Sequence, residues 1–129
     1  MPYDFLIDHD RRWLTIVATD PVSLAVAAEV LQRQAAEGAW SYRTLVDLRL
    51  LEWAPTTNEV RAILDETQRL TTTYGDRGPV AVVATNLALL GMARMYSTLA
   101  EMVGAQIVTA YSDIEAAEQW LRDQRLNTD

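Results

Sequence analysis

A pair of adjacent threonines, Thr56 and Thr57, follows Pro55 at the start of a helical apolar pattern. Glu59 stands three residues after Thr56. This spacing is typical of a capping box, in which a hydroxyl and a carboxylate each accept a backbone amide at a helix start. The same amides, with the partial positive charge of a helix start, can also bind an anion or a phosphate. We therefore predict that the pair caps a helix, and we treat it as a candidate switch or partner-binding site.

Asp47, Arg49 and Trp53 precede this pair and form a second group of candidate partner-binding residues. Asp47 and Arg49 share one face of a strand, because side chains repeat every two residues, and the spacing allows an ion pair. A carboxylate at the carboxyl end of a parallel strand lies at the edge where open α/β sheets bind ligands. Trp53 is interpreted either as cover for the core or as an exposed anchor for a partner.

The segment at residues 86–104, NLALLGMARMYSTLAEMVG, holds three of the four methionines and carries charge only at Arg94 and Glu101. Its apolar face is wider than the roughly 100° that a helix needs to cover a sheet. A neighbouring helix, a second copy of the chain in a homodimer, or a small apolar ligand could each cover the excess face. The candidate residues for such an interface or ligand site are Met92, Met95, Tyr96, Leu99 and Met102.

The composition excludes most classes of catalytic centre. The chain has 129 residues, with 18 acidic residues, 11 basic residues that are all arginine, no cysteine and one histidine. The absence of lysine and cysteine excludes a Schiff base, a P-loop lysine, thiol catalysis and cysteine-ligated metals. A net charge of −7 argues against a nucleic-acid partner. We therefore expect a protein that is not an enzyme, uses no cofactor or metal, and binds no nucleic acid.

The same sequence favours a cytoplasmic protein. No apolar run approaches the roughly 20 residues needed to cross a bilayer, so membrane insertion is not expected. The first ten residues lack the basic and apolar regions of a secretory signal. The length fits a single domain over residues 1–129.

The apolar patterns predict the elements that position these residues. Strands are expected at 3–9, 13–19, 42–49, 79–85 and 106–111, with helices after all but the first. Asp20 and Pro21 are predicted to begin the first helix as its cap and its first-turn proline. Two neighbouring strands favour a hairpin, and strands separated by helices favour right-handed crossovers. The predicted fold is α/β, with a single five-stranded, mixed but mostly parallel sheet in the order β-β-α-β-α-β-α-β-α.

This order of elements resembles the STAS family of anti-sigma-factor antagonists, particularly its SpoIIAA-like relatives. In that family a strand ending in Asp-Leu leads through a turn to an Asp-Ser-Ser/Thr-Gly motif at a helix start. The first serine of the motif is the phosphorylation site that switches partner binding. Here Val46-Asp47-Leu48 resembles the strand end, and Pro55-Thr56-Thr57-Asn58 occupies the place of the motif. Thr56 is similar in position to the phosphoacceptor, while Pro55 and Asn58 replace the motif's Asp and Gly and argue against a working phosphoswitch.

The resemblance implies a non-enzymatic regulatory or protein-interaction module. Its partner would be another protein or a second copy of the chain. The alternative, which rests on the Met-rich segment, is a carrier or sensor of a small apolar, lipid-like ligand.

Overall fold

The computed structural model describes residues 2–20, 22–104 and 106–126. Five strands lie in these ranges: β1 (Tyr3–Asp8), β2 (Trp13–Thr19), β3 (Arg43–Leu50), β4 (Val80–Val83) and β5 (Val108–Tyr111). Four helices accompany them: α1 (Leu24–Ala36), α2 (Thr57–Tyr74), α3 (Leu87–Val103) and α4 (Ile114–Asp123). The order of elements is the one predicted from the sequence.

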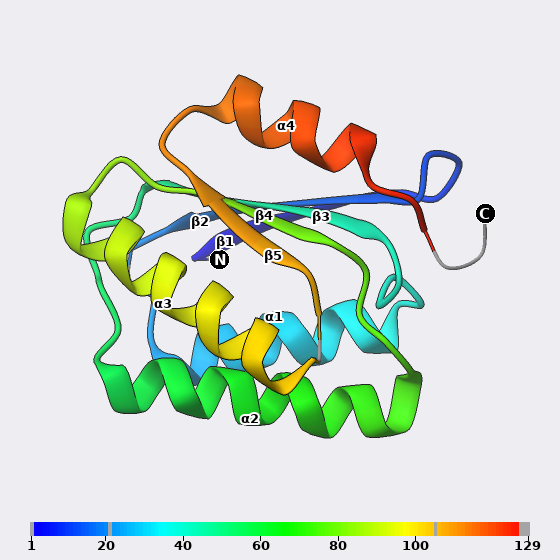
Figure 1. Ribbon diagram of the computed structural model, residues 1–129, viewed down its shortest axis with the longest axis horizontal. Coiled ribbons are helices and arrows are strands. Elements are labelled where there is room, and N and C mark those ends of the chain that lie inside the picture. The colour runs from blue at the N-terminus through cyan, green and yellow to red at the C-terminus, as the bar shows by residue number, and fades with distance from the viewer. Residues whose placement is uncertain (1, 21, 105, 127–129) are drawn as a thin grey trace.

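The strands form one sheet in the order β1-β2-β3-β4-β5 (Figure 1). β1 pairs antiparallel with β2, and each later pair of neighbours is parallel. The predicted mixed sheet with one antiparallel edge is therefore confirmed. The loops that follow β2, β3 and β4 all lie at the carboxyl edge of the sheet, where ligands of open α/β sheets bind.

The chain crosses the sheet in one direction, so successive right-handed crossovers place their helices on the same face. Accordingly, α1, α2 and α3 cover one face, and α4 alone covers the other (Figure 1). α4 packs on β3, β4 and β5. The buried core under α4 consists of Trp13, Leu45, Ala81, Val83, Ala117 and Leu121. Within the described residues, none of the helices has the length and apolar character required to cross a bilayer.

The beginning of α1 differs from the prediction. Its cap is Ser23, whose Oγ accepts the amide three residues later at 3.3 Å, and the predicted cap Asp20 lies outside the helix. Pro21 falls outside the described residues. The Asp20 carboxylate instead accepts the amides of Glu52 at 2.8 Å and Trp53 at 3.3 Å. Asp20 therefore fastens the end of β2 to the loop at residues 51–56, the β3–α2 loop.

Candidate functional site

Asp47 and Arg49 form the ion pair that their spacing allows. Arg49 Nε lies 2.9 Å from Asp47 Oδ1, Arg49 Nη2 lies 2.7 Å from Oδ2, and the Arg49 amide donates to Oδ1 at 3.1 Å. Asp47 is 7% exposed. The hydrogen bond from the Arg49 side chain lowers the pKa of Asp47, against the opposing effect of burial. The carboxylate is thus held charged with both oxygens engaged, an arrangement that suits a structural ion pair better than an acid or base.

Replacing Asp47 with asparagine is expected to lower the free energy of unfolding by about 1–2 kcal/mol near neutral pH. A charged hydrogen-bonded pair is lost, although Arg49 faces solvent and the effect is reduced accordingly. The lowered pKa means that the pair stabilises the fold above the ordinary carboxyl pKa of about 3.9 and stops doing so as the pH falls through the lowered value. Urea unfolding should therefore show the difference shrinking as the pH is lowered below the ordinary carboxyl pKa. Asp65→Asn, at an exposed position on α2, is the matched control.

Thr56 is the N-cap of α2, as predicted. Its Oγ1 accepts the Glu59 amide at 3.2 Å, and Glu59 Oε1 accepts the Thr56 amide at 2.9 Å, which completes the capping box. Thr56 and Thr57 are both exposed. The pair is therefore accessible to a partner, but the Thr56 hydroxyl already has a structural hydrogen bond and a carboxylate beside it.

Thr56→Ala should destabilise the protein by about 1 kcal/mol, because the Glu59 amide loses its acceptor at the helix start. Thr57→Ala, one residue later and equally exposed, should change the free energy of unfolding by less than about 0.5 kcal/mol. Thermal or urea unfolding of both variants measures the difference between their free energies of unfolding. Equal losses for the two substitutions would contradict the assignment of Thr56 as the cap.

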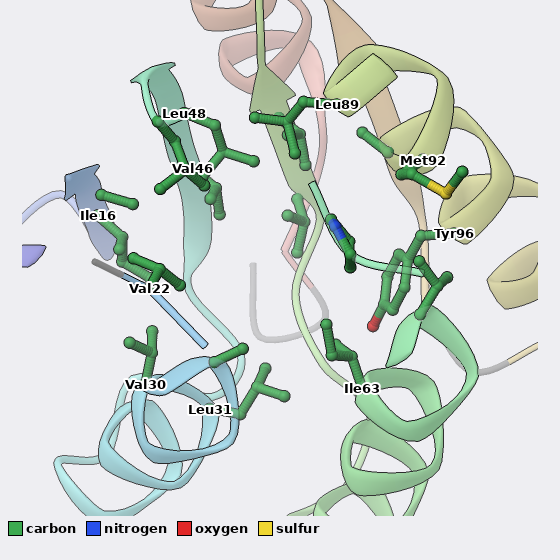
Figure 2. Close-up of a pocket in the computed structure, with 18 of the residues that line it drawn as sticks. Ile16, Val22, Val30, Leu31, Val46, Leu48, Ile63, Leu89, Met92 and Tyr96 are labelled. Carbon is green, nitrogen blue, oxygen red and sulfur yellow. The ribbon is translucent and has the colours of Figure 1, made fainter. Parts of the chain in front are cut away.

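An apolar cavity of about 180 Å³ lies between the sheet and the layer of α1, α2 and α3 (Figure 2). Alternate residues of β3 point to opposite faces, so Val46 and Leu48 line the cavity while Asp47 and Arg49 do not. Figure 2 shows the strand side chains facing those of the helices across the cavity, with the labelled residues Ile16, Val22, Val30, Leu31, Val46, Leu48, Ile63, Leu89, Met92 and Tyr96.

The packing of the helices explains this space. Within this layer, α1 packs on α2, and α2 packs on α3. The helix whose backbone packs closely on a strand is α3, and that strand is β5. Side chains alone therefore bridge α1 and α2 to the sheet. At the carboxyl edge the β3–α2 loop contributes Leu51, Trp53 and Pro55 to the lining. Trp53 is half-buried, which favours the interpretation of this residue as cover for an apolar interior.

The predicted candidates on α3 divide into two sets. Met92 and Tyr96 line the cavity, and the partly buried Leu99 packs in the core between α3 and the sheet. Met95 is half-buried, and Met102 is 77% exposed. The structure thus brings Met92 and Tyr96 together in the cavity and leaves Met102 on the surface.

Arg77 lies just before β4, at the amino end of the strands, and also lines the cavity. It is 7% exposed; its Nη2 donates to Gln34 Oε1 at 2.7 Å and its Nη1 to Gln106 Oε1 at 3.3 Å. The guanidinium lies over the Trp40 ring, 5.1 Å from its centroid. Burial lowers the pKa of Arg77, and Tyr96 partly opposes this effect. The apolar cavity therefore contains a cation whose hydrogen-bond acceptors are neutral.

Further hydrogen bonds hold the two glutamines. Gln34 Nε2 donates to Thr44 Oγ1 at 2.9 Å and to a backbone carbonyl. Gln106 Nε2 donates to Tyr96 Oη, which is itself 2.9 Å from Thr67 Oγ1. Because each amide nitrogen has its own acceptors, each amide oxygen is directed to the guanidinium. A buried polar layer thus runs across the amino end of the cavity.

The sequence did not reveal this polar layer. Gln34 lies in a buried helical stripe and Arg77 in a turn, 43 positions later. The local signal was that Gln34 shares the stripe of Leu31 and Ala35, and this spacing does not indicate which residue Gln34 contacts. As for metals, no group of three or more His, Asp or Glu side chains within the described part of the chain is placed to hold an ion.

Comparison with known proteins shows which solved structures share this fold. No protein-family model matches the sequence, and no curated protein matches it either. Two solved structures are similar over nearly their whole length. One is the crystal structure of an anti-sigma factor antagonist from Mycobacterium paratuberculosis, with a TM-score of 0.56, 20% identity, and coverage of 94% of this chain and 95% of that one. The other is the NMR structure of the protein TM1081, with a TM-score of 0.55, 14% identity, and coverage of 95% and 89%. The chain thus has the fold of an anti-sigma factor antagonist.

Proposed function

We propose that this chain is a non-enzymatic regulatory module that binds a protein partner through the carboxyl edge of its sheet. The observation that carries this proposal is the apolar surface at that edge. Leu50, at the end of β3, is 66% exposed, and Leu87, at the start of α3, is 83% exposed. Exposed Thr56 and Thr57 begin α2 at the same edge. Large exposed apolar side chains rimmed by polar ones are typical of protein-interaction sites.

The similar structure from Mycobacterium paratuberculosis suggests the class of partner, an anti-sigma factor. The test measures the affinity of purified anti-sigma factors from the same genome for the wild-type chain and for a variant with Leu50→Glu and Leu87→Glu. The variant should bind at least about 10-fold more weakly. Ile107→Glu, at an apolar position before β5 that is 61% exposed, is the matched control and should bind as the wild type does. Unchanged binding by the double variant would contradict the proposed surface.

We further propose that Thr56 is not a working phosphoswitch. Its hydroxyl is engaged in the capping box, and the Glu59 carboxylate would repel a phosphate there. Intact-mass measurement of protein purified from its native cells should show no added phosphoryl group. A homodimer through α3 remains a prediction, for which exposed Met102, Val103 and Ile107 offer an apolar surface.

The cavity favours a second candidate function, the binding of a small apolar ligand. Its volume of about 180 Å³ slightly exceeds that of an engineered apolar cavity, about 150 Å³, that stays dry and binds benzene. The β3–α2 loop that lines it leads directly into the capping box of α2, so an occupant would touch the segment that carries the proposed partner surface. Native mass spectrometry of the purified protein should show a co-purifying small molecule. Two results together would contradict this function: the purified protein has the mass of the chain alone, and added 1-octanol does not raise its thermal stability.

A further inference from the structure

The charge of Arg77 is not matched by a carboxylate. Its hydrogen bonds to the two glutamine oxygens use two of the five N–H donors of a guanidinium, and the other polar group beside it is the Tyr96 hydroxyl, which is also neutral. Its Nε is fully buried and has no hydrogen-bond partner. Since a buried charge without a counter-charge is costly, such a group calls for an explanation.

The surroundings of Arg77 point toward the cavity as the place of a counter-charge. Of the described residues that line the cavity, Arg77 is the single charged one, and Tyr96 places a hydroxyl near it. Arg77 also lines a second cleft, together with the acidic residues Asp76 and Glu101 and the basic residue Arg125. Among the described residues, neither Asp76 nor Glu101 forms an ion pair with Arg77, so the guanidinium receives no carboxylate counter-charge from that cleft.

The geometry also holds the guanidinium in place. Gln34 and Gln106 are each fixed by their own amide hydrogen bonds, and the Trp40 ring supports one face of Arg77. A group held in this way needs little reorganisation to receive a ligand. A carboxylate is the natural complement, because its two oxygens match the forked donors of arginine.

We propose that the ligand of the cavity is a small amphipathic anion, an apolar body with one carboxylate, and that Arg77 binds the carboxylate. This inference rests on the second candidate function, since it specifies the ligand of the same cavity. The apolar body lies among Val46, Leu48 and Met92, and the carboxylate lies at the amino end of the strands beside Arg77.

The test compares two probes with the same eight-carbon chain, octanoate and 1-octanol, by isothermal titration calorimetry near neutral pH. The wild-type protein should bind octanoate at least about 10-fold more tightly than 1-octanol. Arg77→Met should weaken octanoate binding by roughly 10- to 100-fold and leave 1-octanol binding unchanged, because the apolar contacts remain. Arg69→Met, at an exposed arginine on α2, is the matched control and should bind both probes as the wild type does.

The outcomes separate the two proposals. Equal affinity of the wild-type protein for octanoate and 1-octanol overturns the anion inference and leaves the cavity as an apolar site. Binding of neither probe overturns both. Should Arg77→Met fail to fold by circular dichroism, the comparison of the two probes on the wild-type protein still decides the inference.

Discussion

Replacing Gly78 with alanine is expected to destabilise the protein by about 3 kcal/mol or more. A Cβ at this position would lie 2.4 Å from the carbonyl oxygens of both Ser41 and Tyr42. These are backbone atoms of the segment that leads into β3, so they cannot rotate away as a flexible side chain would. The Gly78 amide also donates to Trp40 O at 3.0 Å and holds the two segments together. The same close approach sets the position of the neighbouring Arg77 over the Trp40 ring.

Gly91→Ala is the matched control for this prediction. Gly91 lies inside α3, and an added Cβ meets no atom within 4 Å. Alanine should therefore stabilise the helix by about 0.5–1 kcal/mol, through its better helix propensity. Urea unfolding should therefore show a lower free energy of unfolding for Gly78→Ala and a higher one for Gly91→Ala, each relative to the wild type. A Gly78→Ala variant as stable as the wild type would show that the segments can separate at no cost.

Leu121→Ala is the second large expected effect, a loss of about 3–5 kcal/mol. Leu121 is fully buried on α4, which alone covers its face of the sheet, and it packs on Trp13, Leu45 and Val83. With one helix over this face, no second element can move in to fill the space that the truncation leaves. Urea unfolding followed by circular dichroism measures the loss.

Leu87→Ala provides the comparison for the same substitution on the surface. Leu87 is largely exposed at the start of α3, so its truncation should change the free energy of unfolding by less than about 0.5 kcal/mol. A similar loss at both positions would contradict the assignment of Leu87 to a free surface. A small loss at Leu121 would contradict the role of α4 as the sole cover of its face.

The fold could be predicted because each element carries its own local signal. The uncharged run that became β4 and the alternating residues of β1 needed no knowledge of distant contacts. The capping box of Thr56 was equally local, since both partners lie within one helical turn. The prediction for Asp20 was wrong for the opposite reason. Its carboxylate accepts hydrogen bonds from the amides of Glu52 and Trp53, which are more than thirty residues away.

The candidate site was predictable only in part. The sequence indicated an unusually apolar α3, and Met92 and Tyr96 do line the cavity. The cavity itself depends on how far α1 and α2 stand from the sheet, and periodicity within one helix carries no such information. The polar layer joins residues of α1, the α2–β4 turn and the segment before β5, so no single segment could show that Arg77 and Gln34 meet.

Mapping a ligand by NMR tests most directly whether the cavity and the carboxyl edge form one functional site. In a ¹⁵N–¹H titration of the wild-type protein with 1-octanol, we predict shifts of the amides of cavity-lining Val46, Leu48 and Met92. The amides of Trp53 and Thr56 in the β3–α2 loop should shift in the same titration, since that loop lines the cavity and leads into α2. Shifts confined to the exposed apolar residues Met102, Val103 and Ile107, or no saturable shifts at all, would contradict a binding site in this cavity.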